Sequence, residues 1–573
     1  MWKQRSPEAE ANNLPPGSLG LPVIGESISF AIKKVAFFKE RHERFGRIFK
    51  TNLFGKRTVR VYGADNIRKL VSGEGQIVRS SYPTSVRKLL GDQALSMSHG
   101  DVHKEKKTQL MKYLSPEFFH NHCPILANTI AERVQKWQHQ SPIDIHFETR
   151  KLFMELAARF LINIDITGEV IEQLMKELEI FTDNVFCLPF NIPGFGFHKA
   201  TKAKLRMREI IASSLTESVN NNDTDGLSSV LQGLKAETND VPIHENYALL
   251  DSIIDLLFSG SETVSSAGFS LLHQLSKHEN VSERLRQEAH SHGLVKLEEP
   301  VCARDVQDMP FVDAVVKETL RILPPVGGAF REVLQSFELE GYTIPKGWTV
   351  VFGIRETHER DSTVTSTSTF LPERWLHDKN SSSSSPTMFP FGGGARVCPG
   401  QAYAKMILKL FTVELSRSSA LELVQDSPLC FWPSPKPVNK VLVNVDLHHQ
   451  CHDRTCETDA LCAVPSQGLM CSCKQGYVFL DETEDVCVDM DECARHMHDP
   501  CSHRGRCVNT VGGYRCECLH GWDLEHEHCK KKTSQDAKCM PGYTGDHCQE
   551  IVSAKKAGLK QIPAIRRESV TLM

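Results

Sequence analysis

The chain has 573 residues, 40% of them hydrophobic, and a formal net charge of -4. This length predicts more than one domain, and the apolar fraction is large enough to build a sizeable core. The near balance of charge gives no reason to expect nucleic acid or a strongly charged substrate as a partner.

The 19 cysteines are distributed unevenly along the chain. Before residue 450 there are only Cys123, Cys187, Cys302, Cys398 and Cys430. The other fourteen crowd between positions 451 and 548. The first part is therefore typical of a protein from a reducing compartment, and the second part is typical of a secreted disulfide scaffold.

The chain begins with a polar stretch, Met1 to Asn13, which predicts a disordered tail without a signal peptide or a membrane span. Leu14 to Gly17, Leu-Pro-Pro-Gly, predicts a stiff and extended entry. A helix is expected from about Ala36 to Phe45. Two strands, Ile48 to Phe54 and Thr58 to Tyr62, should follow as a hairpin with a short turn between them.

Basic residues stand at two places in this first part. Lys56, Arg57 and Arg60 lie beside the hairpin turn, where a solvated role is expected for at least one of them. His103 and Lys107 are four residues apart at the start of a predicted helix, so they share one face. That face suits two carboxylates, and a plain surface helix is the competing interpretation.

The middle of the chain, from Leu152 to about Ala236, is predicted to be mostly helical. An interruption is expected at Leu188 to Gly194, and a polar loop at Asn220 to Ser228.

A long apolar helix is expected from Ala248 to Leu272, and its acidic residues favour a buried core helix over a membrane span. It contains the sequence Ser-Gly-Ser-Glu-Thr, in which Gly260 and the hydroxyl residues predict an opening of the helical hydrogen-bond ladder. Glu262 beside Thr263 at that opening is an acid next to an alcohol, which suits proton delivery. A kinked core helix with satisfied polar groups is the alternative.

Three charged residues predict a buried cluster. Glu318 and Arg321 are three residues apart on one helical face, and Arg374 lies in the later stretch Phe-Leu-Pro-Glu-Arg-Trp. Such a cluster would be costly to break, whereas an isolated surface pair would contribute little. Arg331 supplies another cation, and Ser381 to Ser385 predicts a low-complexity loop.

The stretch from Phe389 to Gly400 reads Phe-Pro-Phe-Gly-Gly-Gly-Ala-Arg-Val-Cys-Pro-Gly. Its three consecutive glycines let the backbone turn sharply and pass close to a bulky planar group. Arg396 precedes Cys398 by two residues and suits a carboxylate, and an apolar-periodic segment then predicts a helix. The combination predicts a site where Cys398 binds haem iron; a buried cysteine in an ordinary glycine loop is the alternative.

This loop resembles the haem-thiolate loop of the cytochrome P-450 family, through Phe391, Gly394, Arg396, Cys398 and Gly400. The helix with the Glu-Thr pair, the Glu-x-x-Arg pair, the Pro-Glu-Arg-Trp stretch and the cysteine loop follow in the family's order. The resemblance implies a mainly α fold with small β-sheets over residues 14–446. Within the family, the sequence is most similar to the retinoic acid hydroxylases, notably at Val59 to Asn66, Ile344 to Trp348 and Phe411 to Leu415.

The resemblance also implies roles for individual residues. Cys398 would be the axial thiolate, and Phe391 would lie against the haem. The haem propionates would face His103, Lys107, Arg331 and Arg396. The substrate pocket would be lined by Tyr82, Phe258, Thr263 and Val326, with Lys56 or Arg60 meeting the substrate carboxylate. Tyr82 and Val264 depart from the family, where tryptophan and a second threonine are usual.

The implied activity is a monooxygenation of a lipophilic substrate. Electrons from NADPH would arrive through a cytochrome P-450 reductase, and one atom of O2 would enter a C–H bond. Retinoic acid 4-hydroxylation is the expected reaction, and a sterol or another lipid is the alternative substrate. Members of the family usually sit on the cytosolic face of the endoplasmic reticulum membrane, which is the location that the resemblance implies.

The tail holds two six-cysteine units that resemble epidermal growth factor-like (EGF-like) modules. We place the modules at residues 447–488 and 489–529, a partial third at 530–550, and a disordered basic tail at 551–573. The resemblance implies that, in each module, the first cysteine pairs with the third, the second with the fourth and the fifth with the sixth. The spacing of the cysteines alone leaves the pairing open. A zinc site is the alternative, but the spacing fits it poorly. The cysteines are Cys451, Cys456, Cys462, Cys471, Cys473 and Cys487; Cys493, Cys501, Cys507, Cys516, Cys518 and Cys529; and then Cys539 and Cys548.

The second module resembles the calcium-binding version of this fold. Asp489, Glu492 and Asn509 would supply hard oxygen ligands, and backbone carbonyl groups would complete the shell. A solvated acidic linker is the alternative interpretation. Such modules imply a protein partner and an oxidising compartment.

Two classes of function therefore remain open. The chain is either an enzyme acting on a retinoid-like lipid, or an extracellular calcium-dependent interaction protein with an inactive monooxygenase segment. The two halves also imply different compartments. The enzyme half implies the cytosolic face of a membrane, whereas the EGF-like half implies an oxidising compartment, because disulfides rarely persist in the cytosol.

Overall fold

The computed structural model describes most of the chain. Its described residues run from 13 to 447, with gaps at 23, 93, 115, 163, 165, 167, 221–240, 295–300, 362–365 and 377–387. Beyond them the described segments are 460–463, 470–473, 477–479, 487–491, 493–494, 501, 505–510, 513–518, 522–525, 528–531, 543–544 and 550–551.

Several predictions fall on the residues that are left out. The predicted tails, apart from Asn13 and Ile551, and nearly all of the polar loop after Asn220 lie outside the described residues. The same holds for the Ser381 to Ser385 loop, Glu492, Cys451, Cys456, Cys539 and Cys548.

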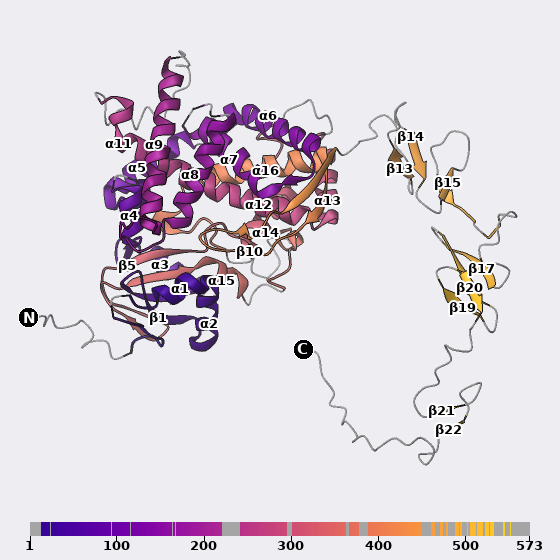
Figure 1. Ribbon diagram of the computed structural model, residues 1–573, viewed down its shortest axis with the longest axis horizontal. Helices are drawn as coiled ribbons and strands as arrows, with labels where there is room; N and C mark the ends of the chain where they lie inside the picture. The colour runs from indigo at the N-terminus through magenta and orange to yellow at the C-terminus, as the bar shows by residue number, and fades with distance from the viewer. Residues whose placement is uncertain are drawn as a thin grey trace, which may run out of the picture. The chain divides into compact units, whose positions relative to one another are not determined.

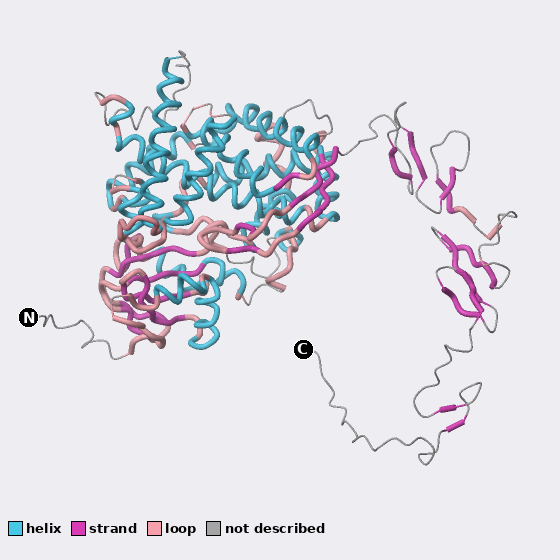
Figure 2. The backbone as a smooth tube through the Cα atoms, viewed as in Figure 1, coloured by secondary structure: helices cyan, strands magenta, loops and turns pink. Residues whose placement is uncertain are grey.

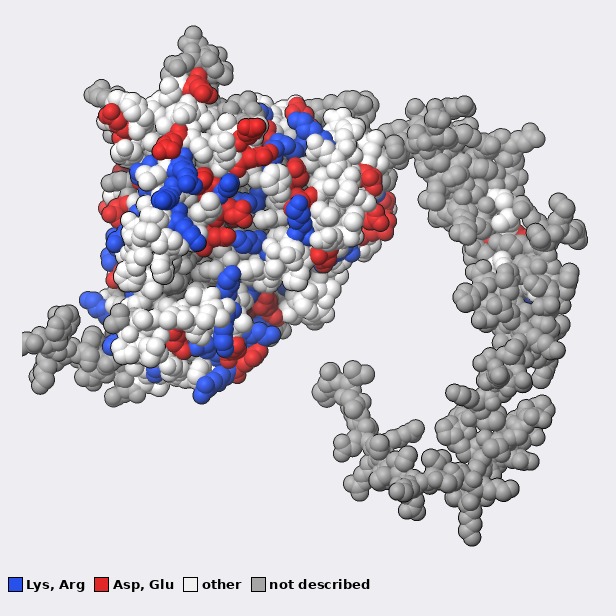
Figure 3. All heavy atoms as spheres, viewed as in Figure 1, with Lys and Arg blue, Asp and Glu red and all other residues white. Residues whose placement is uncertain are grey.

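The chain forms two compact units, Met1–His448 and His449–Met573. In the first unit, helices gather in one part, and the largest sheet lies with α1, α2 and α15 in the other (Figures 1 and 2). Lysine, arginine, aspartate and glutamate side chains are interspersed over the visible face of this unit (Figure 3). In the described part of the chain, no helix combines the length and the apolar character needed to cross a bilayer.

The helices of the first unit make up most of its structure, so the predicted mainly α fold with small sheets is confirmed. They are α1 (Ser27–Lys33), α2 (Val35–Phe45), α3 (Ala64–Ser72), α4 (Thr84–Leu90), α5 (Gly100–Tyr113), α6 (Pro116–Gln140), α7 (Ile145–Leu161), α8 (Gly168–Asn184), α9 (Gly196–Asn220), α11 (Tyr247–Leu257), α12 (Thr263–Leu275), α13 (Glu279–Ser291), α14 (Pro310–Ile322), α15 (Ile354–Glu359) and α16 (Gln401–Ser418). Shorter 3-10 turns are η2 (Leu95–Met97), η4 (Ile243–Glu245), η6 (Pro372–Trp375) and η7 (Gly394–Arg396).

Small sheets complete this unit. The largest has the order β1-β2-β8-β5-β3, from β1 (Ile48–Leu53), β2 (Lys56–Val61), β8 (Thr349–Gly353), β5 (Gly328–Val333) and β3 (Val78–Ser80). A second has the order β4-β12-β9, from β4 (Ile143–Asp144), β12 (Leu442–Leu447) and β9 (Ser419–Gln425). Two further pairs are β6 (Phe337–Leu339) with β7 (Tyr342–Ile344), and β10 (Leu429–Cys430) with β11 (Lys436–Pro437).

The predicted hairpin forms at β1 and β2, which pair antiparallel from Ile48 with Val61 to Leu53 with Lys56. Phe54 and Gly55 make the turn with positive φ angles of 53° and 76°, a conformation that glycine adopts without strain. β2 then runs parallel to β8, which places Arg60 opposite Val351. This pairing brings a residue near the start of the chain beside the segment that leads into α15.

The predicted opening of the long apolar helix is confirmed. Between α11 and α12 the helix widens into a π-helical turn, η5 (Phe258–Glu262). The hydroxyl groups of Ser261 and Thr263 donate to the carbonyl oxygens of Leu257 and Ser259, at 2.6 and 2.7 Å. Because such bonds compete with the backbone ladder, they stabilise the widened turn.

The second unit consists of paired strands. They are β13 (Ala460–Ala463) with β14 (Met470–Cys473), β15 (Tyr477–Phe479) with β16 (Cys487–Asp489), β17 (Gly505–Thr510) with β18 (Gly513–Cys518), β19 (Trp522–Glu525) with β20 (His528–Lys531), and β21 (Tyr543–Thr544) with β22 (Glu550–Ile551).

Disulfides Cys493–Cys507 and Cys501–Cys516 join the first with the third and the second with the fourth cysteine of one unit, as the resemblance implied. Cys518 is disulfide-bonded as well. The side chains of Cys462, Cys471, Cys473, Cys487 and Cys529 are outside the described part, although these residues lie in strands.

The three predicted cluster residues meet in the interior of the first unit. The Glu318 side chain is fully buried and accepts hydrogen bonds from Arg321 at 2.8 and 2.9 Å. Arg374 Nε donates to the same carboxylate at 3.0 Å, as does Trp375 Nε1 at 2.9 Å. Burial alone would raise the pKa of Glu318, but these bonds and the Arg321 charge lower it overall. The cluster ties α14 to η6.

Replacing Glu318 by glutamine should destabilise this unit. We expect Glu318→Gln to lower the free energy of unfolding by about 3 kcal/mol, because two desolvated guanidinium groups lose their carboxylate. Helical circular dichroism followed against urea concentration measures the change. Glu40→Gln breaks the exposed pair with Lys33 and is the matched control, with an expected change below about 1 kcal/mol. Equal losses in the two variants would contradict the account.

Candidate active site

The glycine-rich loop before α16 is packed closely against α3. Gly392 and Gly394 have positive φ angles of 71° and 63°. A Cβ atom at Gly394 would lie 2.2 Å from the carbonyl oxygen of Val71, so only glycine allows this approach. The Cys398 amide donates to the Phe391 carbonyl at 3.0 Å. These contacts fix the backbone that carries the cysteine.

The Cys398 side chain is exposed and not disulfide-bonded. Its pKa is nevertheless raised, mainly because the surrounding protein desolvates the thiolate; the Gly400 amide and the Lys107 charge act in the opposite direction. A metal cation bound to the sulfur would stabilise the thiolate that desolvation disfavours, so the free thiol of Cys398 suits a ligand to iron.

The predicted helix face with His103 and Lys107 reaches this loop. Lys107 Nζ donates to the carbonyl oxygens of Ala395 and Val397, at 3.0 and 2.8 Å. The pKa of His103 is lowered to about 4 by burial and by the charges of Arg396 and Lys107. The imidazole is therefore neutral near pH 7, and it would act on a carboxylate as a hydrogen-bond donor.

Arg331 and Arg396 meet at Glu74, which the sequence analysis missed. Arg331 Nε lies 2.9 Å from Glu74 Oε2, and Arg396 Nε lies 3.2 Å from Glu74 Oε1. Arg396 also donates to the carbonyl oxygen of Ser98 at 2.7 Å. Arg331, Arg396 and Lys107 carry three positive charges against one negative charge on Glu74. The surplus of two positive charges suits the two propionates of haem.

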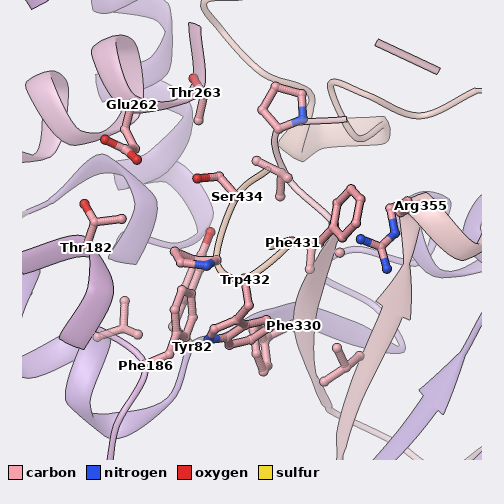
Figure 4. A pocket seen from close by; sticks show the side chains of 18 of the residues that line it. Tyr82, Thr182, Phe186, Glu262, Thr263, Phe330, Arg355, Phe431, Trp432 and Ser434 are labelled. Atoms are coloured by element: carbon pink, nitrogen blue, oxygen red, sulfur yellow. The ribbon is translucent and has the colours of Figure 1, made fainter. Parts of the chain in front are cut away.

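A cavity of about 290 Å³ lies beside η5. It is lined by the predicted residues Tyr82, Phe258, Glu262, Thr263, Val326 and Arg60. Further aromatic side chains in its wall include Phe186, Phe330, Phe431 and Trp432 (Figure 4). Lys56 is exposed at the start of β2 and is not part of this lining, because the side chain stands at the tip of the hairpin. Of the two cations predicted for the substrate, the structure therefore brings only Arg60 to the cavity.

The acid and the alcohol of the long helix both reach the cavity. Burial raises the pKa of Glu262, so the carboxyl keeps its proton to a higher pH than usual. Asp255, two turns earlier, also lines the cavity, and burial raises its pKa to about 6. Ser96 Oγ donates to it at 3.1 Å. In the sequence, Asp255 stood out only as one of the acidic residues that argue against a membrane span. Its partner Ser96 is 159 positions away in the chain, so no local pattern connects the two.

In the second unit, two of the three predicted calcium ligands are in contact. Asn509 Nδ2 donates to Asp489 Oδ2 at 2.7 Å. Asp491 Oδ1 accepts from the backbone amides of Cys493 and Ala494, at 3.0 and 3.1 Å. In the parts that the structure describes, which exclude Glu492, no three His, Cys, Asp or Glu side chains gather as a metal site.

Comparison with known proteins identifies the family. Residues 15–434 match the cytochrome P-450 family profile. The chain belongs to this family. Residues 489–534 match the profile of the calcium-binding EGF domain. The resemblances to the cytochrome P-450 family, to its retinoic acid hydroxylases and to a calcium-binding EGF-like module are confirmed. The module placed at residues 447–488 stays a prediction.

Individual relatives cover most of the first unit. Human (Homo sapiens) cytochrome P-450 26B1 is 33% identical over 421 residues, which are 72% of this chain and 82% of the relative. Cytochrome P-450 26A1 of Xenopus laevis is 35% identical over 435 residues, or 74% of this chain and 88% of the relative. The solved structure of retinoic acid bound cyanobacterial CYP120A1 matches with a TM-score of 0.68 and 30% identity, covering 76% of this chain and 99% of that one.

The protein is therefore a cytochrome P-450 monooxygenase with a calcium-binding EGF domain. The family implies haem, O2, a lipophilic substrate and a reductase. The free thiol of Cys398 and the positive charges of Lys107, Arg331 and Arg396 fit that cofactor.

Proposed function

We propose that this monooxygenase oxidises retinoic acid, by 4-hydroxylation. The observation that carries the proposal is the polarity of the cavity. Glu262 and Thr263 lie on one side, Arg355 lies on the other, and aromatic side chains lie between them (Figure 4). An apolar chain that ends in a carboxylate matches this arrangement. The protein of the related solved structure is bound to retinoic acid.

Each part of the site then has a task. Haem, when bound, supplies the activation of O2 and the oxidation of the C–H bond. Cys398 would bind its iron through the thiolate, and Phe391 would pack against it. Arg331, Arg396, Lys107 and His103 would hold the propionates.

The cavity residues act on the substrate. The aromatic wall, with Phe258 and Val326, orients the polyene and excludes water. Tyr82 adds a phenol whose pKa is raised by burial, so it stays protonated near neutral pH and keeps a proton to donate to a ligand. Thr263 already donates to the Ser259 carbonyl at 2.7 Å. With Glu262 it would hold and pass the protons that oxygen activation consumes.

Thr263→Ala should uncouple the reaction. With purified reductase, NADPH and retinoic acid, we expect the unchanged chain to form 4-hydroxyretinoic acid, identified by mass spectrometry. Thr263→Ala should give about 100-fold less product for each NADPH consumed, because the proton-delivering hydroxyl is gone. Thr263→Ser keeps the hydroxyl and is the matched control. Absence of oxidised retinoid from a haem-loaded chain would overturn the proposed substrate.

We also propose that the second EGF-like module binds calcium through Asp489, Glu492 and Asn509. Its support is the contact between Asp489 and Asn509 and the match to the calcium-binding domain. Carboxylate and amide oxygens are the ligands that calcium prefers. Bound calcium would stiffen the module for a protein partner.

Asp489→Ala should weaken calcium binding by at least about 10-fold, since it removes a charged ligand. Isothermal titration of the full chain with calcium measures the affinity. Arg515→Ala, which breaks only an exposed pair with Glu517, should bind calcium as the unchanged chain does. If Asp489→Ala and Arg515→Ala titrate alike, the proposed ligand set is wrong.

A further inference from the structure

The polar end of the cavity is built from two neighbouring segments. Arg60 comes from β2, and Arg355 and Glu356 come from the first turn of α15, directly after β8. All three line the cavity. They are buried, with exposed fractions of 4%, 8% and 8%. A charged cluster at this depth needs internal partners.

Arg60 has such a partner in Glu356. Arg60 Nη2 donates to Glu356 Oε1 at 2.6 Å, and the guanidinium lies 4.2 Å from the ring centroid of Phe38. Burial would raise the pKa of Glu356, but Arg60, the helix backbone and Arg355 lower it overall, so the carboxylate is charged. The charge of Arg60 is thus largely balanced inside the protein.

Two glycines leave room for the Arg60–Glu356 pair. A Cβ atom at Gly353 would lie 2.3 Å from Glu356 Oε2 and 2.7 Å from Arg60 Nη2. A Cβ atom at Gly328 would lie 3.2 Å from Arg60 Nη1. The pair therefore occupies space that other residues at these positions would fill.

Unlike Arg60, Arg355 lies in the cavity wall without a hydrogen bond to a carboxylate among the described residues. Its guanidinium lies 4.1 Å from the ring centroid of Phe431, and Figure 4 shows the two side chains together at the wall away from Glu262 and Thr263. Arg355 Nε is 3.1 Å from Glu359 Oε1 but makes no hydrogen bond there. Among the described residues, its terminal nitrogens have no hydrogen-bond partner. The Glu359 side chain is 51% exposed, so solvent screens the charge that it offers.

The terminal nitrogens of Arg355 leave room for one anion. At the cavity wall, Arg60 and Arg355 carry two positive charges and Glu356 carries one negative charge. Glu359 lies against Nε of Arg355 from the solvent side. The planar guanidinium of Arg355 presents two terminal N–H groups that match a carboxylate.

We propose that Arg355 binds the carboxylate of the substrate, while Glu356 holds Arg60 as a fixed second cation. This proposal rests on the proposed function and adds the residue that selects an acid over the corresponding alcohol. The predicted choice between Lys56 and Arg60 is thereby revised. Lys56 does not reach the cavity, and Arg60 is already paired.

The test compares two ligands that differ only in the end group, retinoic acid and retinol. Quenching of tryptophan fluorescence measures binding to the full chain, because Trp432 lines the cavity. The unchanged chain should bind the acid at least about 10-fold more tightly than the alcohol. Arg355→Gln should weaken binding of the acid by about 10- to 100-fold and leave retinol unchanged.

The controls separate this effect from misfolding. Arg360→Gln makes the same charge change on an exposed residue that packs over Tyr62 and lies outside the cavity lining, and it should bind both ligands as the unchanged chain does. Glu359→Gln removes the competing carboxylate and should tighten binding of the acid by a few fold, a gain that a folding defect would not produce.

The outcomes are distinguishable. Equal loss of both ligands in Arg355→Gln, or no loss of the acid, overturns the subsite but leaves retinoid binding in the cavity. Failure of the unchanged chain to bind either retinoid overturns the proposed function, and the subsite with it.

Discussion

The site depends on a backbone contact that only glycine permits. Gly394 lies against the carbonyl oxygen of Val71, and the loop that it turns carries the free thiol of Cys398. The thiolate is disfavoured there by desolvation, and a cation bound to the sulfur would reverse that preference. Lys107 ties the same loop to α5 through two carbonyl oxygens. The fold thus prepares a position for iron through packing, before any ligand is considered.

The cavity beside η5 is polarised along its length. Proton-holding groups lie at η5, and the widened π-helical turn exists because hydroxyl side chains compete for the helix carbonyls. Guanidinium groups lie at the other wall, where β2 and β8 run parallel. A substrate with one charged end would therefore be bound in one direction only, and that direction presents its apolar end to the Glu262 side. Orientation is the protein's main contribution in chemistry of this kind.

Local features of the site could be predicted from the sequence, and distant ones could not. The hairpin, the opened helix and the Glu318–Arg321 pair are each encoded within a few residues, so turn chemistry and helical spacing were sufficient. Arg60 and Glu356 are 296 positions apart, and Arg396 and Glu74 are 322 apart. No spacing rule connects such residues, because the sheet and the packing of the loop on α3 bring them together. Of the two alternatives for the substrate carboxylate, Lys56 stays at the hairpin turn, where the sequence allowed a solvated role, and Arg60 lines the cavity.

The two units keep their cysteines in different chemical states. Cys123, Cys187, Cys302, Cys398 and Cys430 are free, whereas the described module of the second unit has disulfides. The first unit needs at least one reduced sulfur, and the second needs oxidised ones. The most direct test of the account is the carbon monoxide difference spectrum of the reduced full chain, with Cys398→Ser beside it. We expect a Soret band at the position typical of thiolate-ligated haem, and its loss in Cys398→Ser. A chain that takes up no haem, or a variant that keeps the same band, would contradict the account.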